Sequence, residues 1–367
     1  MPGKLRPTLD WFLVFVPIAV VLRYWAGSDH QAALFACSGV AIVPLARLMG
    51  RATEHLSERL GQGMGALLNA TFGNAAELII ALMALQKGLV EVVKASITGS
   101  IIGNILLVFG ASALVGGFKH GHVRFNLQAV QTSTTSLKLA AIGLLIPAIF
   151  QYSAALLPSG WKAETGQHLS LAIALVLFAT YFCTLLFSFR NRTRQVQGES
   201  GPEVVAPQVE PMWSLGKSTL VLLVSTALVA WMSEFLVGAV EDTRAALGVT
   251  DVFIGVIIVA VIGNAAEHST AVWMALKNKM DLSLGIAVGS SLQMALFVAP
   301  LLVFVSYAFG QRMDLEFTIP EIVAVIVAVH IAAVITSDGE TNWLEGLQLL
   351  SVYFILGLLF YFLPPAK

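Results

Sequence analysis

The five residues Gly-Asn-Ala-Ala-Glu occur twice in this sequence, at 73–77 and again at 263–267. Each copy ends in a glutamate, Glu77 or Glu267, and each glutamate lies inside a long apolar stretch. An unpaired charge at the centre of a membrane costs at least about 2.5–3.5 kcal/mol, and a carboxyl group found there usually marks an ion path. The two glutamates therefore predict a site that carries cations.

Two buried carboxyl groups can hold either two protons or one divalent cation. Burial favours the protonated form of a carboxyl group, whereas a bound metal ion favours the ionised form. The pair is nearly neutral with either load, so the loaded site can cross the membrane at low cost. We predict that Glu77 and Glu267 are metal ligands that also bind the protons, which is the chemistry of exchange.

Each copy also places a glycine and an asparagine one helical turn before its glutamate, at Gly73 and Asn74 and at Gly263 and Asn264. A helix can open at such a point and expose carbonyl oxygens, and the amides offer further oxygens. Calcium binds 6–8 oxygen ligands, so these donors favour a hard cation over a soft transition metal. The alternative is that Gly and Asn only allow close helix packing, as small residues do in membranes.

Polar residues outside the two copies form a second group of candidates. Hydroxyl and amide groups on the following helices can ligate an ion, or they can hold helices together. Two acidic residues near the ends of apolar stretches can guide ions, or they can be solvated acids at the interface. These candidates are Ser100, Asn104, Ser290, Gln293, Glu54 and Glu234.

The composition of the chain places such a site in a lipid bilayer. Of its 367 residues, 57% are hydrophobic and 12% are charged, whereas about a quarter of the residues of a soluble domain are charged. The formal net charge of −1 shows no basic excess, which excludes nucleic acid as a partner. We expect the bilayer as a partner and no cofactor.

The apolar stretches predict an all-α polytopic membrane protein. A helix that crosses about 30 Å of hydrocarbon needs about 20 mostly apolar residues. Eleven stretches meet this criterion, roughly at 10–27, 29–50, 62–86, 91–117, 125–150, 168–189, 216–240, 250–276, 282–308, 319–337 and 343–363.

The duplication extends beyond the five residues and divides the chain into two halves. At the same spacing of 190 residues, Lys87 matches Lys277 and Gly99-Ser100 matches Gly289-Ser290. Each half has five spans, and an odd number inserts the second half upside down, as in the inverted repeats of many transporters. The predicted divisions are an extra N-terminal helix at 1–28, a first five-helix repeat at 29–190, a cytoplasmic linker at 191–215 and a second five-helix repeat at 216–367.

The positions of the basic residues predict the orientation of the chain. With the N-terminus inside, the cytoplasmic segments collect 13 of the 21 Lys and Arg residues, whereas the opposite loops include acidic residues such as Glu241, Asp251 and Glu316. The positive-inside rule then favours a cytoplasmic N-terminus and an outer C-terminus. We expect an integral protein of a prokaryotic cytoplasmic membrane.

The two motifs and their surroundings resemble the cation/proton exchanger family of the calcium/cation antiporter superfamily. The motifs read NATFGNAAELI at 69–79 and IGNAAEHSTAV at 262–272, and the resemblance extends to 52–54, 289–293 and 338–346. It implies eleven spans arranged as one plus five plus five. It also implies an antiporter that exchanges calcium for protons, with Glu77 and Glu267 as the shared cation and proton site.

Three other functions would require other features of the sequence. A sodium/calcium exchanger would need further acidic and hydroxyl ligands, and Gln293 stands where a carboxylate would serve it. A passive cation channel stays open as an alternative, although paired inverted motifs fit a carrier better. An enzyme is not expected, because the sequence has no His-Glu-x-x-His and no Gly-x-Ser-x-Gly motif.

Overall fold

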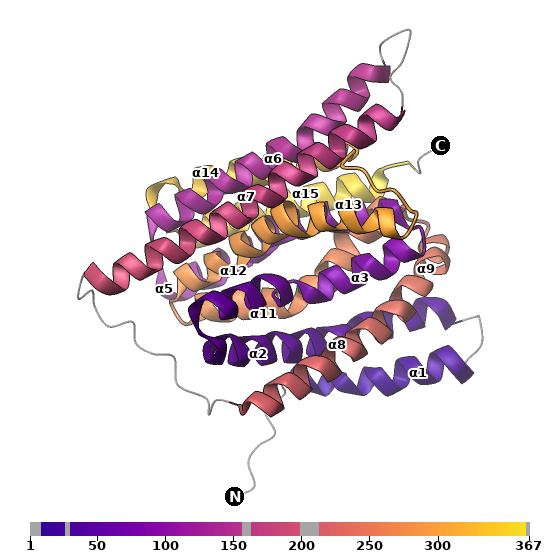
Figure 1. The fold of residues 1–367 in the computed structure, drawn as a ribbon, viewed down its shortest axis with the longest axis horizontal. Helices are drawn as coiled ribbons and strands as arrows, with labels where there is room; N and C mark the ends of the chain where they lie inside the picture. The colour runs from indigo at the N-terminus through magenta and orange to yellow at the C-terminus, as the bar shows by residue number, and fades with distance from the viewer. Residues whose placement is uncertain (1–8, 26–29, 156–162, 199–212, 365–367) are drawn as a thin grey trace, which may run out of the picture.

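The computed structural model describes residues 9–25, 30–155, 163–198 and 213–364, and these residues form a bundle of helices (Figure 1). The first half contains η1 (Leu9–Val14), α1 (Phe15–Trp25), α2 (Gln31–Phe72), α3 (Ala75–Gln86), α4 (Val90–Ile102), η3 (Gly103–Val108), α5 (Phe109–His120), β1 (Val123–Arg124), α6 (Leu127–Ala155) and α7 (Ala163–Gly198).

The second half contains α8 (Leu215–Gly238), α9 (Val240–Leu247), α10 (Asp251–Phe253), η4 (Ile254–Val259), α11 (Ala260–Leu276), α12 (Met280–Gln293), η5 (Met294–Val298), α13 (Ala299–Ala308), α14 (Ile319–Ile335), η6 (Thr336–Asp338), β2 (Glu340–Thr341) and α15 (Trp343–Phe362). The elements η3, η4 and η5 are π-helical segments that continue into the neighbouring helices, while η1 and η6 are 3-10 helices.

Within the described residues, nine helices are long and apolar enough to cross a membrane. The expectation of a helical membrane protein is therefore confirmed, and these helices match all the predicted spans except those at 10–27 and 62–86. The first of the two exceptions consists of the 3-10 helix η1 and the short helix α1, so it is less regular than the hydropathy indicated. The other is divided between the end of α2 and the short apolar helix α3.

Helix α2 is assigned as 42 continuous residues, which would be about 63 Å long if the helix were straight. However, the Ser57 hydroxyl donates to the Gly65 carbonyl at 2.7 Å, and residues eight apart lie about 12 Å apart along a straight helix. The chain must therefore reverse between these two residues, and Figure 1 shows it turning back toward α3. Only the part at 31–60 has the length and hydropathy of a span.

Helix α7 extends beyond the predicted end of the first half. The expected linker began at residue 191, whereas α7 continues to Gly198. The residues that follow the span include arginine and glutamine, which are good helix formers, so the helix can continue beyond the membrane. The rest of the predicted linker, up to residue 212, lies outside the described residues.

One feature of the fold was not expected from an all-α assignment. Strands β1 and β2 pair antiparallel, with Val123 opposite Thr341 and Arg124 opposite Glu340. The pairing joins the turn after α5 to the turn before α15, and these two helices also pack closely, because a Cβ on Gly117 would overlap the backbone of Trp343. The contact links the two halves of the sequence at one end of the bundle.

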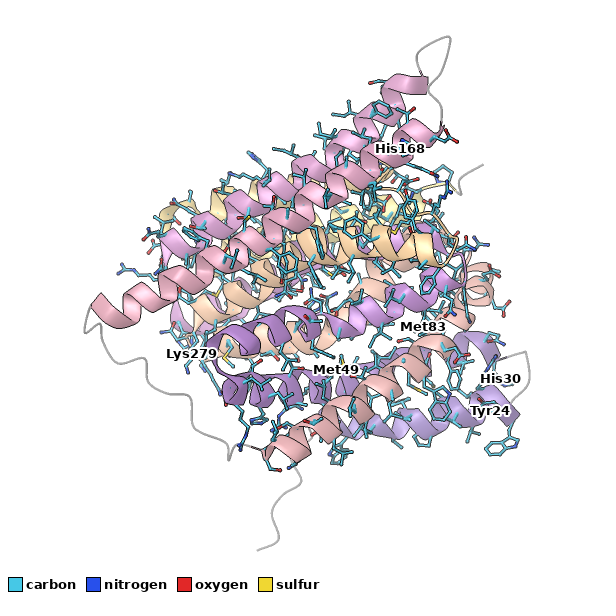
Figure 2. The ribbon with its side chains drawn as sticks, viewed as in Figure 1. Tyr24, His30, Met49, Met83, His168 and Lys279 are labelled. Carbon is cyan, nitrogen blue, oxygen red and sulfur yellow. The ribbon has the colours of Figure 1, made fainter. Side chains whose placement is uncertain are left out.

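The helices that carry the two motif copies run in opposite directions. Met83, near the end of α3, lies at the right of the bundle in Figure 2, whereas Lys279, just after α11, lies at the left. The two helices are also in contact with each other. The chain therefore brings two similar motifs together with opposite polarity.

Candidate functional site

A buried hydrogen-bond network joins the two halves of the chain at the motifs. The Asn104 amide donates to Asn264 Oδ1 at 3.1 Å and to the Ser290 hydroxyl at 3.0 Å, and the Asn264 amide donates to the Ser100 hydroxyl at 3.0 Å. All four residues are buried, with at most 5% of each residue exposed. Four of the predicted site residues from α4, η3, α11 and α12 therefore lie in one cluster.

Asn74 joins this cluster from the first motif copy. It occupies the N-cap position of α3 without making the usual side-chain cap bond. Its amide instead donates to the Ser290 carbonyl at 3.3 Å, and its Oδ1 accepts from the Ser290 hydroxyl at 3.4 Å. The helix is interrupted at Gly73 and Asn74, and the side chain of Asn74 that could have capped the new helix is directed to the cluster.

Glu77 and Gly263 make the closest contact between the two motifs. Glu77 lies in the first turn of α3 and is 7% exposed. A Cβ added to Gly263 would lie 3.1 Å from Glu77 Cγ and 3.7 Å from its Cδ. Glycine at 263 thus gives the Glu77 side chain room to lie against the backbone of α11, beside the second motif.

Glu267 lies on the continuous helix α11 and has a carboxylate oxygen without a partner. Within the described residues, Glu267 Oε2 and Asn104 Oδ1 are buried and accept no hydrogen bond. The Glu267 carboxyl also interacts electrostatically with Glu77, and Ser290 lies within hydrogen-bonding reach of it. Buried oxygens without donors are suited to a cation, since such groups otherwise carry a desolvation cost.

The oxygens of the cluster are those that calcium uses. Two carboxylates, amide oxygens and hydroxyls are available, and the helix break at Gly73 and Asn74 can add backbone carbonyls. Within the described part of the chain, no three His, Cys, Asp or Glu residues are grouped as a metal site. A divalent cation bound here would therefore draw most of its ligands from neutral oxygens.

Three of the predicted candidates lie apart from this network. Glu54 on α2 and Glu234 on α8 are both exposed, and Gln293 is partly buried at the end of α12. In the described residues, none of the three side chains makes a hydrogen bond to the network. The structure thus brings together Asn74, Glu77, Ser100, Asn104, Gly263, Asn264, Glu267 and Ser290 and leaves out Glu54, Glu234 and Gln293.

Sequence reasoning missed His268, which directly follows Glu267. Its ring is largely buried, and its Nε2 has no hydrogen-bond partner among the described residues. The first copy has Leu78 at the matching position, so the difference between the two copies was the signal that could have revealed it. A histidine nitrogen next to Glu267 in the sequence is a ligand that suits transition metals. The preference for a hard cation therefore rests on the many oxygens of the cluster.

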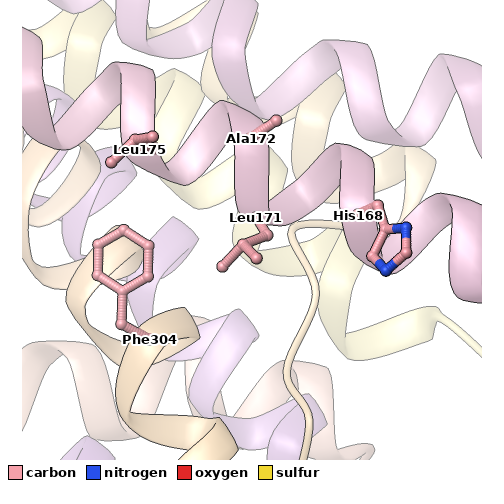
Figure 3. A pocket seen from close by; sticks show the side chains of 5 residues that line it. All are labelled: His168, Leu171, Ala172, Leu175 and Phe304. Carbon is pink, nitrogen blue, oxygen red and sulfur yellow. The ribbon is translucent and has the colours of Figure 1, made fainter.

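A separate pocket of about 400 Å³ lies between α7 and α13 (Figure 3). Its lining consists of His168, Leu171, Ala172, Leu175 and Phe304, which are apolar apart from the histidine. None of the predicted site residues belongs to this lining. The pocket lacks the oxygen donors that a cation requires, so it is not part of the site.

Comparison with known proteins identifies the family of the chain. The family model described as sodium/calcium exchanger protein matches residues 30–190 and 217–362. The chain belongs to the sodium/calcium exchanger family. The matched regions lie one in each half of the chain, and with its long apolar helices the chain is an integral membrane protein.

Curated relatives of this exchanger-family chain cover nearly its whole length. It is 46% identical over 366 residues to the Ca²⁺/H⁺ antiporter of Aphanothece halophytica, which covers 96% of this chain and 95% of that protein. It is 43% identical over 351 residues to the Ca²⁺/H⁺ antiporter ChaA of Bacillus subtilis, with 95% and 97% covered. The resemblance seen in the sequence is therefore confirmed.

Solved structures agree with the fold of this exchanger-family chain. The structure of native YfkE superposes with a TM-score of 0.82 at 40% identity and covers 97% of this chain and 100% of that one. The H⁺/Ca²⁺ exchanger CAX superposes with a TM-score of 0.64 at 12% identity, covering 96% and 91%. The second likeness concerns the fold alone.

Proposed function

We propose that this protein is a secondary active antiporter that exchanges calcium or another divalent cation for protons by alternating access at Glu77 and Glu267. The observation that carries the proposal is the meeting of both motif copies in one buried oxygen cluster, with Glu77 packed against Gly263. The names of the relatives at 43% and 46% identity support the same pair of ions. All of these relatives are named as antiporters, which agrees with a protein that is not an enzyme.

In this proposal, the glutamates of the cluster bind the ions, and its asparagines and serines have a supporting role. Glu77 and Glu267 bind calcium when ionised and hold protons when neutral, so the two loads compete for the same oxygens. Asn74, Asn104 and Asn264, with Ser100 and Ser290, contribute neutral oxygens and keep the carboxyl groups in place. Because both loaded states are nearly neutral, the protein can change its accessibility with either load but not with an empty, doubly charged site.

The proposal includes a topology of eleven spans, one plus two inverted repeats of five. It is supported by the opposite directions of α3 and α11 and by the chain reversal between Ser57 and Gly65, which separates the span at 31–60 from the end of α2 that leads into α3. The basic residues then favour a cytoplasmic N-terminus and an outer C-terminus. Bacterial relatives agree with a location in the cytoplasmic membrane.

Single cysteines test this topology. The free cysteines Cys37 and Cys183 are first replaced by serine, and a new cysteine is then placed at Lys279 or at Asp242. A membrane-impermeant thiol reagent should label the first only from the cytoplasmic side and the second only from outside. Labelling of both from one side would contradict the proposed arrangement.

Calcium flux in proteoliposomes tests the function. An imposed pH gradient should drive uptake of radiolabelled calcium by the natural protein, and Glu77→Gln or Glu267→Gln should abolish it while the purified protein keeps its fold. Glu164→Gln is the matched control, because Glu164 is an exposed glutamate at the start of α7. Normal flux in either site variant would exclude the assigned carboxylates.

The same vesicles separate the alternatives. A sodium/calcium exchanger would transport calcium with a sodium gradient at equal pH, and a passive channel would equilibrate calcium without either gradient. The partly buried amide of Gln293 lies outside the network, so the described cluster has no third carboxylate for a separate sodium site. Flux that follows the sodium gradient alone would replace the proposed function with the first alternative.

A further inference from the structure

Lys94 is a buried lysine in α4 that the exchange chemistry does not use. Only 6% of the residue is exposed. Its Nζ lies 2.9 Å from Glu91 Oε1, 3.3 Å from Asp314 Oδ1 and 2.9 Å from the Glu316 carbonyl. An ammonium group has three donors, and all three are engaged. Two of the three acceptors belong to the segment between α13 and α14.

Thr98 extends the same connection one turn further along α4. Its hydroxyl donates to Glu321 Oε1 at 2.9 Å, and Glu321 Oε2 accepts from the Thr318 backbone at 2.9 Å and from the Thr318 hydroxyl at 2.7 Å. Glu321 is 2% exposed and also forms the capping box of α14. Helix α4 is therefore fastened along one side to the start of α14 and to the segment before it.

That segment is itself fixed to the helices behind it. The Leu315 backbone donates to the Ser170 hydroxyl of α7 at 3.1 Å, and the Met313 backbone donates to the Ser306 hydroxyl of α13 at 3.0 Å. Residues Met313 and Leu315 are almost fully buried. The segment that carries Asp314 and Glu316 is thus held by packed helices and is not a free loop.

The cation site lies on another side of α4. At about 100° per residue, Ser100 is rotated about 240° from Lys94 around the helix. Between them, Gly99 packs against η4 so closely that a Cβ would overlap the backbone of Val256. Helix α4 is therefore held between η4 and the segment that precedes α14. The position of α4 sets where Ser100 and the following Asn104 meet Asn264.

We propose that Lys94 is a positioning residue of the exchanger, which holds α4 so that Ser100 and Asn104 form their half of the cation site; this rests on the proposed function. The matching residues of the second half, 190 positions later, are Leu284 in place of Lys94 and Val288 in place of Thr98. The fastening therefore belongs to the first half alone.

The test measures the KM of calcium transport in proteoliposomes and the equilibrium Kd for calcium in detergent. The variants are Lys94→Met, Lys94→Arg and Thr98→Val. The control is Lys87→Met, because Lys87 is exposed and, among the described residues, its ammonium group makes one weak hydrogen bond, at 3.5 Å to the Glu234 carbonyl. Loss of a residue that orients metal ligands typically weakens metal binding about 10–100-fold. We expect Lys94→Met to raise the KM and the equilibrium Kd for calcium about tenfold, and Thr98→Val about threefold.

Lys94→Arg keeps the charge and should stay within about threefold of the natural protein, and Lys87→Met should not change either constant. If Lys94→Met does not fold, because it strands two carboxylates, the triple variant Lys94→Met/Glu91→Gln/Asp314→Asn removes those charges and should show the same tenfold loss. A folded Lys94→Met or triple variant with the natural Kd and KM would overturn the proposal. If the natural protein shows no proton-driven flux, the proposed function fails, while the Kd comparison still decides the role of Lys94.

Discussion

The same five residues adopt two local structures in this protein. In the first copy, the helix is interrupted at Gly73 and Asn74, and Glu77 lies in the first turn of a new helix. In the second copy, the motif lies within the continuous helix α11, which is preceded by the π-helical segment η4. The pentapeptide allows a helix break but does not require one, so the surroundings of each copy decide.

The two glutamates differ accordingly. Glu77 is buried against Gly263, whereas Glu267 is partly exposed and keeps one oxygen without a hydrogen-bond partner among the described residues. A carrier with inverted halves should present its halves differently in any one conformation, and exchange them in the other. The difference indicates that the two carboxyl groups share one function from unequal positions.

The contacts that hold the two halves differ in the same way. On one side Lys94 bridges Glu91, Asp314 and the Glu316 backbone. On the other, the Asn126 backbone donates to Asp281 Oδ1 at 2.6 Å without any lysine. Positions 126 and 316 correspond at the spacing of 190 residues, and so do 281 and 91. The equivalent contact in the other half thus runs directly from a backbone N–H to the carboxylate, whereas here Lys94 lies between Glu91 and the Glu316 backbone.

The largest effect should appear in the pH dependence of calcium binding. If two protons leave for each calcium bound, the Kd rises by up to about a hundredfold per pH unit of acidification while both groups are protonated. Glu77→Gln and Glu267→Gln should each reduce this slope to at most about tenfold, with weaker binding. Isothermal titration at several pH values, with proton release recorded, measures it. A slope that only one variant changes would show that the copies are not equivalent in proton binding.

A methyl group at Gly263 should have the next largest effect. In Gly263→Ala the new Cβ would lie 3.1 Å from Glu77 Cγ, which must move the carboxylate, and a displacement of about 1 Å in a site can cost about a hundredfold in rate. The measurement is the initial rate of proton-driven calcium uptake. The matched control is Gly289→Ala, because a Cβ there meets no atom within 4 Å. Equal uptake rates in Gly263→Ala and Gly289→Ala would show that the position of the Glu77 carboxylate does not limit transport.

A smaller effect is expected from Gly73→Ala, which probes the helix break directly. Alanine favours a continuous helix over glycine by about 1 kcal/mol, so the first copy should shift toward the conformation of the second. That free energy corresponds to about a fivefold loss of transport rate if the break is needed for the cycle. Flux assays and circular dichroism measure the two consequences. An unchanged rate with increased helicity would show that the break is dispensable.

The smallest effect concerns Glu316, in the segment that holds Lys94. Burial, together with the charge of Asp314, raises the pKa of Glu316, against the opposing charge of Lys94. The folded state therefore binds the proton more tightly than the unfolded state, and its stability falls as the pH rises from the unfolded toward the folded pKa. Since the group is partly exposed, Glu316→Gln should stabilise the protein by less than about 1 kcal/mol at pH 7. Melting curves should show no such gain near pH 3, where the carboxyl group is protonated in both states.

Much of the fold could be predicted from hydropathy. Nine helices of the described residues match predicted spans, because burying apolar residues in lipid while pairing every backbone group requires long helices. Hydropathy could not predict the interruption at Gly73, the continuation of α7 to Gly198 or the pairing of Val123 with Thr341. The interruption at Gly73 lies inside an apolar stretch and does not change its hydropathy. The other two features lie beyond the ends of the apolar stretches, where hydropathy carries no signal.

The sequence by itself determined which residues could carry ions, because the duplicated Gly-Asn-Ala-Ala-Glu places a carboxylate in two apolar stretches, where a charge is too costly to be incidental. Only the tertiary structure decided which candidates meet. Ser100, Asn104 and Ser290 join the network, whereas Glu54, Glu234 and Gln293 do not. The physical reason is that hydrogen bonds between residues 160 or more positions apart, as from Asn104 to Asn264, depend on how helices pack, and packing is not encoded in any local pattern.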